Sequence, residues 1–240
     1  MADSAQWRYP TFSKSIIVIV GGFGSGKTEV SVNLAKFLKA NGHDLVSLVD
    51  LDLVNPYFRT REARTELKAL GIDLIAPEGG KFYADLPILL PQVRSLVEDP
   101  EGLLILDVGG DEQGTKALGS ISDIFNDGEY DMLMVLNSRR PQTSNVETSL
   151  GTMERVESTS RLHFTGLISN THMIDETDGE IVIEGYKLSV EISKRTNLPM
   201  AFVSAKRNVL NDLKPADIDC PVLPLTRSLL KPWERKENAV

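Results

Sequence analysis

Short runs of apolar residues alternate along the chain with stretches in which apolar residues recur every three or four positions. The short runs are rich in Val, Ile and Leu, which is typical of strands buried on both faces of a sheet. We expect seven such strands and a weaker eighth, at residues 16–20, 45–49, 72–76, 103–106, 132–136, 164–168, 200–203 and 222–225.

The periodic stretches predict amphipathic helices between these strands. Their apolar stripes fall at residues 30–38, 63–70, 86–96, 146–153 and 181–192, and Thr177 and Glu180 suggest a capping box at the start of the last one. Strand and helix in alternation predict right-handed crossovers. We therefore expect an α/β fold: a doubly wound, mostly parallel sheet of seven to eight strands with helices on both faces.

The length of 240 residues suits one large domain. We expect a single nucleotide-binding domain over residues 1–240, with 1–14 and 226–240 as peripheral tails. The tail is not expected to insert stably in a membrane, because Pro232 interrupts its short apolar face.

A glycine-rich segment follows the first expected strand and fits the phosphate-loop pattern G-x-x-x-x-G-K-[ST]. Glycines let the backbone curl so that successive N–H groups point into one concavity and bind phosphate oxygens. The helix that starts near Lys27 adds its positive end. Lys27 is the predicted catalytic cation, and the Thr28 hydroxyl is a predicted Mg²⁺ ligand. The predicted nucleotide contacts in this loop are Gly22, Phe23, Gly24, Ser25, Gly26, Lys27, Thr28 and Glu29.

Aspartates stand at the ends of the second and fourth expected strands. Mg²⁺ prefers oxygen ligands and usually keeps several waters. Asp107 suits a role in holding such a water, and Asp50 suits the outer shell of the metal. Asp52 is the candidate that orients or deprotonates the attacking water. The alternative is that these aspartates cap helices or bind turn amides.

Three further residues are predicted to switch with the nucleotide. Gly109 and Gly110 would let the loop after Asp107 move toward a γ-phosphate and away again after hydrolysis. Asn55, after the second strand, opens a segment with aromatic and arginine side chains. That segment is either a switch surface or part of the core.

The sixth expected strand runs into Ser169-Asn170-Thr171-His172-Met173. The Asn170 amide is suited to pair with adenine, whereas GTPases tend to use Asn-Lys-x-Asp. Since no carboxylate stands in register to read guanine, the sequence favours ATP over GTP. The alternative for Asn170 is a plain turn residue.

Composition narrows the possible partners and compartments. With 34 acidic and 26 basic residues the net charge is −8, so long-range repulsion makes generic nucleic-acid binding unfavourable. The single cysteine, Cys220, allows no disulfide within the chain. Residues 1–10 lack the apolar core of a signal peptide, and no run is long enough to span a bilayer. We expect a cytoplasmic protein.

The phosphate loop, the Asp-x-Asp at Asp50 and Asp52, and the glycines after Asp107 together resemble the MinD/ParA/CobQ-type proteins of the SIMIBI class, over about residues 15–225. The resemblance implies Mg·ATP binding, slow hydrolysis and nucleotide-controlled dimerisation. It also implies that Asp50 supports the metal and Asp52 handles the water. Gly22 stands where many members carry a second lysine that reaches a partner's nucleotide, so the chain resembles a divergent branch.

Three functions remain open from the sequence. The first is a slow ATP hydrolase whose nucleotide state controls a protein partner or a homodimer surface. The second is an ATP-dependent ligase or phosphotransferase, in which Arg139 and Arg140 clamp a small acidic substrate. The third is a nucleotide sensor that binds ATP without hydrolysing it.

Overall fold

The computed structural model describes residues 6–52, 64–76 and 82–227. Its strands form one eight-stranded sheet in which every neighbouring pair is parallel. The strands are β1 (Ile16–Gly21), β2 (Val46–Leu51), β3 (Asp73–Ile75), β4 (Leu103–Gly109), β5 (Tyr130–Leu136), β6 (Gly166–Ser169), β7 (Met200–Lys206) and β8 (Val222–Leu225). The predicted doubly wound α/β architecture is confirmed.

The strand order is β3-β2-β4-β1-β5-β6-β7-β8. The chain therefore builds outward from β1 in one direction through β4, β2 and β3, and in the other direction from β5 to β8. In such a sheet, ligands bind beyond the carboxyl ends of the strands at the point where this direction changes. That point is the carboxyl end of β1, where the glycine-rich loop begins.

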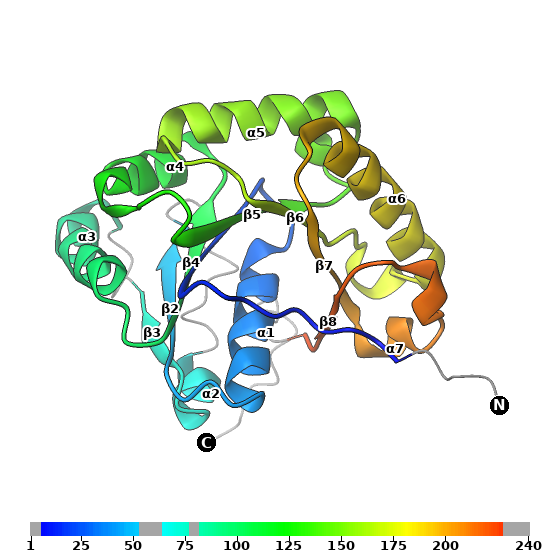
Figure 1. The fold of residues 1–240 in the computed structure, drawn as a ribbon, viewed down its shortest axis with the longest axis horizontal. Helices are drawn as coiled ribbons and strands as arrows, with labels where there is room; N and C mark the ends of the chain where they lie inside the picture. The colour runs from blue at the N-terminus through cyan, green and yellow to red at the C-terminus, as the bar shows by residue number, and fades with distance from the viewer. Residues whose placement is uncertain (1–5, 53–63, 77–81, 228–240) are drawn as a thin grey trace, which may run out of the picture.

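Helices cover both faces of the sheet (Figure 1). One face is covered by α3 to α6, with the one-turn α7 packed beside α6 at the β8 end, and the other face by α1 and α2. The helices are α1 (Lys27–Ala40), α2 (Arg64–Ala69), α3 (Phe82–Glu98), α4 (Glu112–Gly119), α5 (Val146–Ser160), α6 (Gly179–Thr196) and α7 (Arg207–Leu210). Short 3₁₀ turns include η2 (Ser122–Ile124), η3 (Pro141–Thr143), η4 (Ile174–Glu176) and η5 (Pro215–Asp217).

The core follows from the alternation of side chains along the central strands. In β1, Val18 and Val20 pack toward α3–α6, whereas Ile17 and Ile19 pack toward α1 and α2. All four side chains are fully buried. A strand that is apolar at consecutive positions is thus buried on both faces, as the sequence pattern predicts.

Two local features differ from the sequence analysis. It predicted no helix after Gly110, where Asp111 caps α4 by accepting hydrogen bonds from the Gln113 and Gly114 amides at 2.9 and 3.0 Å. The predicted capping box at Thr177 is replaced by Asp178, whose carboxylate accepts from Ile181 N at 2.9 Å.

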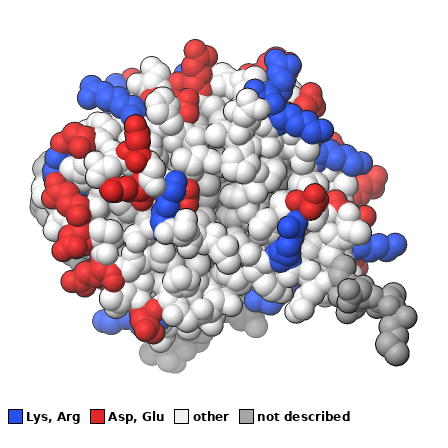
Figure 2. Space-filling view, viewed as in Figure 1, with Lys and Arg blue, Asp and Glu red and all other residues white. Residues whose placement is uncertain are grey.

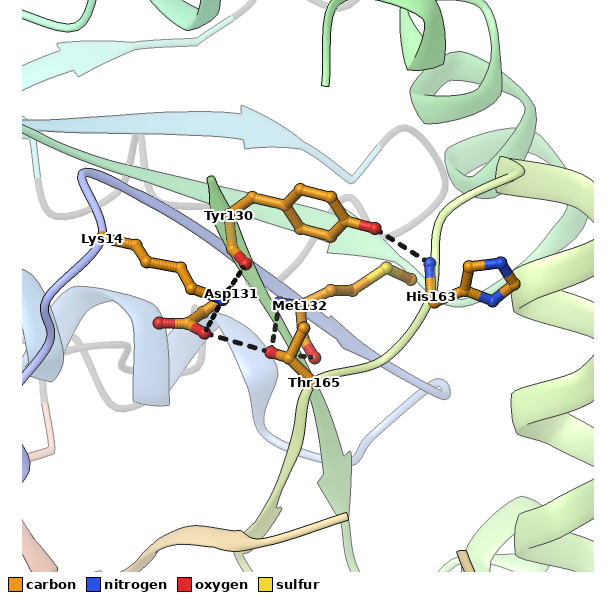
Figure 3. A network of polar contacts seen from close by, with 6 residues as sticks. All are labelled: Lys14, Tyr130, Asp131, Met132, His163 and Thr165. Carbon is orange, nitrogen blue, oxygen red and sulfur yellow. Dashed lines mark hydrogen bonds and ion pairs between the residues drawn. The ribbon is translucent and has the colours of Figure 1, made fainter. Parts of the chain in front are cut away.

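The amino-terminal edge of the sheet is tied together by polar contacts (Figure 3). Lys14, which precedes β1, donates to Tyr130 O at 2.8 Å and pairs with Asp131 at 3.1 Å. Thr165, which precedes β6, donates to Asp131 Oδ1 at 3.2 Å and accepts from Met132 N at 3.0 Å. This network joins the start of β1, β5 and β6 at the edge opposite the glycine-rich loop.

Charge on the face shown in Figure 2 is uneven: acidic side chains gather along the left edge, and basic ones are scattered along the top and right. The expectation that the chain does not bind nucleic acid stays a prediction, as does its cytoplasmic location. Within the described part of the chain, no helix combines the length and the apolar character needed to cross a membrane.

Candidate nucleotide-binding site

The glycine-rich loop has the curled backbone that its sequence predicts. Gly24 and Gly26 adopt positive φ values of 73° and 86°, a region that residues with a Cβ rarely enter. Ser25 N donates to Gly22 O at 3.0 Å, and α1 begins directly after Gly26. The N-terminus of α1 therefore points into the loop, as phosphate binding requires.

Lys27 makes a buried ion pair with Asp52. Their side-chain atoms Nζ and Oδ2 lie 2.6 Å apart, and the two side chains are 6% and 2% exposed. Burial alone lowers the pKa of Lys27, but the negative charges of Asp52, Asp107 and Asp50 outweigh it and raise the pKa. Lys27 is thus a permanent cation at the floor of the loop.

The predicted metal residues meet beneath this lysine. Asp50 lies in β2 beside Asp107 of β4, and Asp50 Oδ1 accepts from Asp52 N at 3.0 Å. Asp107 is completely buried, and among the described residues neither of its carboxylate oxygens has a hydrogen-bond partner. The Thr28 hydroxyl lies near enough to Asp107 to lower the pKa of this carboxyl.

The protonation of Asp107 is unusual. Burial raises its pKa to about 7; Lys27 opposes the shift, and the charges of Asp50 and Asp52 add to it. A further cation bound beside Asp107, such as a metal ion, would favour the charged form of this carboxyl.

Mg²⁺ fits this arrangement, but not as an ion held by protein alone. Within the described residues, no group of three or more His, Cys, Asp or Glu side chains is arranged to hold a metal. Mg²⁺ commonly takes one or two protein oxygens and completes its shell with water and substrate phosphates. The Thr28 hydroxyl and the Asp107 and Asp50 carboxylates offer such oxygens below the loop.

The predicted switch glycines touch the phosphate loop. Gly110 N donates to Gly21 O at 3.1 Å. A Cβ on Gly110 would lie 2.7 Å from that oxygen and 3.1 Å from Gly22 N, and one on Gly109 would lie 3.4 Å from Asp52 Oδ1. The backbone after β4 therefore approaches the loop so closely that only glycine fits. Asn55 lies outside the described residues.

Asn170 supports the loop from the other side. Its buried amide donates to Ser25 O at 2.8 Å, and its Oδ1 accepts from Ser204 Oγ at 2.8 Å. A Cβ on Gly26 would lie 2.3 Å from Asn170 Nδ2. These contacts give Asn170 a structural role that the sequence did not indicate, and its contact with adenine stays a prediction.

A cleft of about 170 Å³ opens beside the loop. Its wall includes Gly24, Gly26, Lys27, Thr28, Glu29, Arg140, Asn170, Thr171, His172, Ile174, Thr177, Ser204, Ala205, Lys206, Leu225 and Arg227. Phe23 is not in this wall and is 72% exposed. The sheet topology thus brings most of the predicted loop residues together with residues that follow β6 and residues of β7 and β8.

The two arginines predicted to clamp an acidic substrate point to different partners. Arg139 pairs with Glu184 of α6 at 2.5 Å, at the surface. Arg140 Nε instead donates to Gly24 O of the phosphate loop at 2.8 Å. The structure therefore does not bring the pair together around one ligand.

Among the cleft-wall residues to which the sequence analysis gave no role are His172 and Ile174. His172 is largely buried, and burial followed by the charges of Arg140 and Lys206 lowers its pKa to about 4. Ile174 has a φ of 57°, which is strained for a β-branched residue. No sequence pattern marks either role, because both follow from how the loop after β6 folds back over Gly26.

Comparison with known protein families and with curated proteins finds no match for this chain. Solved structures do share its fold. Cell division protein FtsY of Thermotoga maritima matches with a TM-score of 0.54 and 17% identity over 85% of this chain. The signal recognition particle receptor FtsY of Elizabethkingia anophelis matches with a TM-score of 0.56 and 16% identity over 92% of this chain.

A structure of the Elizabethkingia receptor in complex with GDP gives a TM-score of 0.55 and 18% identity over 95% of this chain. The match spans 65% of the length of each of these three FtsY chains. These similarities confirm the doubly wound α/β P-loop NTPase fold of the chain. They do not confirm the finer likeness to MinD, ParA and CobQ.

Proposed function

We propose that this protein binds ATP with Mg²⁺ at the Gly21–Thr28 loop and hydrolyses it slowly, as a nucleotide-controlled switch. The observation that carries the proposal is the buried cluster of Lys27 with three aspartates under a curled glycine loop. Burying unbalanced charge is costly unless a ligand compensates it. A magnesium ion supplies that compensation, and the triphosphate supplies the ion's remaining ligands.

The predicted catalytic and metal-binding residues each have a part in this proposal. The loop amides and Lys27 hold the β- and γ-phosphates, so Lys27 must exchange its Asp52 partner for phosphate oxygens. Thr28 binds the metal, and Asp107 and Asp50 hold its waters. Asp52, once released, orients the attacking water.

The proposed switch is the backbone after β4. In the structure Gly110 N bonds to Gly21 O, at the start of the phosphate loop. A γ-phosphate at this place offers a stronger, charged acceptor for the Gly109 and Gly110 amides. Binding and hydrolysis would then move this segment and α4, which Asp111 starts directly after it. A protein partner or a second copy of the chain would read that movement.

Adenine is the proposed base, although an FtsY structure carries GDP. The sequence offers no carboxylate at residues 171–173 to read guanine. The nearest following acid, Asp175, is held by Lys206 at 2.9 Å and by Arg227 at 3.5 Å. Guanine recognition by Asp175 would require breaking these ion pairs.

Release of inorganic phosphate from purified full-length protein tests the function. We expect slow, Mg²⁺-dependent release that is faster with ATP than with GTP and absent in Lys27→Ala protein. Equal release by Lys27→Ala would trace the activity to a contaminant. Tight ATP binding without any release would favour the sensor alternative instead.

A further inference from the structure

Arg140 reaches across the fold to the phosphate loop. It lies in the turn after β5, and its Nε donates to Gly24 O at 2.8 Å. A Cβ on Gly24 would lie 2.9 Å from Nε and 3.3 Å from Cδ of Arg140. The side chain therefore packs directly on the loop at a residue whose positive φ already favours glycine.

The turn that carries Arg140 is held in place by the protein alone. The fully buried Asn137 accepts from Arg139 N at 3.0 Å through Oδ1, and from Arg140 N at 3.0 Å through its carbonyl. Thr143 donates to Asn137 O from its hydroxyl at 2.8 Å and to Arg140 O from its amide at 3.0 Å. The backbone of Arg140 is thus fixed before any ligand arrives.

Arg140 also differs from the other cations of the cleft wall in its charge partners. Lys27 pairs with Asp52, and Lys206 and Arg227 pair with Asp175. Among the described residues Arg140 has no acidic partner, and its only side-chain hydrogen bond uses Nε. Its two Nη nitrogens keep their donors available for a ligand.

The geometry points to Arg140 as a nucleotide-binding residue that presents its guanidinium to the phosphates from within the same chain. This inference rests on the proposed function. Guanidinium groups suit phosphates because they are always charged and offer several donors in one plane. Such a charge acts without a second copy of the protein.

Gln142 of the same turn occupies the space beside Gly22. A Cβ on Gly22 would lie 1.9 Å from Gln142 Oε1 and 3.0 Å from its Cδ. A lysine at residue 22 therefore requires Gln142 to move. The same turn thus fills the space beside Gly22 and carries the cation.

Arg139 offers a matched control, since it is the neighbouring arginine but pairs with Glu184 at the surface. The test measures the dissociation constant for ATP with Mg²⁺ by titration calorimetry, and turnover at several protein concentrations. We expect Arg140→Ala to weaken ATP binding by about tenfold to a hundredfold. Arg139→Ala should stay within about twofold, as expected for a surface ion pair. Turnover per chain should not rise with protein concentration.

A second variant distinguishes a phosphate contact made by the charge of Arg140 from the hydrogen bond that supports Gly24 of the loop. Arg140→Lys keeps the positive charge but removes the Nε–H that holds the loop carbonyl. Partial recovery of ATP binding relative to Arg140→Ala supports the phosphate contact. Equal loss in both variants, with unchanged melting temperature without nucleotide, means loop support only and overturns the inference.

The failure of the inference is distinguishable from that of the proposed function. If the wild-type protein binds no nucleotide, the proposed function fails first. If the wild type binds ATP and Arg140→Ala binds it equally well, only the role of Arg140 is overturned. The role of Arg140 is also overturned if turnover per chain rises steeply with protein concentration and is equal in the wild type and Arg140→Ala.

Discussion

Buried charge is the feature that most needs explaining at the scale of single residues. Counted as whole residues, Lys27, Asp50, Asp52 and Asp107 are each at most 5% exposed, so their charges are largely removed from water. A pair such as Lys27–Asp52 offsets the desolvation cost only in part. Asp107, whose two carboxylate oxygens have no hydrogen-bond partner among the described residues, is then neutralised by a proton, as its pKa of about 7 indicates, or by a metal ion.

Asp52→Asn tests the proposed handling of the attacking water. Loss of the carboxylate should reduce the maximal turnover by about a hundredfold or more, since general base catalysis contributes that much. ATP binding should change far less. Asp131→Asn is the control, because Asp131 lies in the network at the opposite edge of the sheet (Figure 3). Unchanged turnover in Asp52→Asn would remove Asp52 from the chemistry.

His172 gives the protein a predictable dependence on pH. Its folded-state pKa of about 4 lies below the ordinary value of 6.5, mainly because of burial. Between these values the unfolded chain binds more protons, so stability is fully present above 6.5 and is lost as pH falls toward 4.

Denaturant unfolding at pH 7.5 and pH 5 measures this effect. Replacing His172 by Gln should remove roughly 2 kcal/mol of the stability difference between the two pH values. Carboxylates that titrate in the same pH range are present in both the wild type and the His172 variant, so their contributions cancel in the difference between the two proteins. An identical pH dependence in the variant would show that His172 does not stay neutral in the fold.

Among the elements, α4 depends most on close backbone packing. A Cβ on Gly114 would lie 2.4 Å from Gly109 O and 2.7 Å from Gly109 Cα, so α4 sits directly against the proposed switch. Gly114→Ala should therefore destabilise the protein by about 1–3 kcal/mol, as overpacking does. It should also lower phosphate release.

Gly151 in α5 is the matched control for Gly114. Nothing lies within 4 Å of a Cβ added there. Gly151→Ala should stabilise the protein by about 0.5–1 kcal/mol through helix propensity, without changing phosphate release. Chemical denaturation measures both variants, and equal effects would mean that α4 does not pack against the switch as described.

Elements with strong patterns were predictable from the sequence, and weak ones were not. The strand segments before Gly21 and Asp107 are uninterrupted apolar runs, so the functional residues that follow them were found. The helix α4 escaped prediction because it is short, contains Gly114 and ends with Gly119. The cap of α6 was misplaced by one residue, since Thr177 and Asp178 both suit an N-cap and only the fold decides between them.

At the scale of the whole molecule, the sheet order assembles the site. Residues as far apart in the chain as Gly24 and Arg227 line one cleft, at the sheet edge where β1 lies between β4 and β5. A sequence shows which residues follow strands, but not which strands are neighbours. The contacts of Gly24 with Arg140 and of Ser25 with Asn170 join residues more than 100 positions apart. They were therefore beyond sequence reasoning, unlike the loop itself.

Titration of the full chain with ATP and Mg²⁺, beside the Lys27→Ala variant, tests the central claim most directly. We expect saturable binding of one nucleotide per wild-type chain, weakened about a hundredfold or more without the lysine. Because Lys27→Ala leaves the buried Asp52 without its cation, the melting temperature of the variant without nucleotide verifies that it is folded. If neither ATP nor GTP binds the wild-type protein in the presence of Mg²⁺, the Gly21–Thr28 loop after β1 does not hold phosphates, and the account is contradicted.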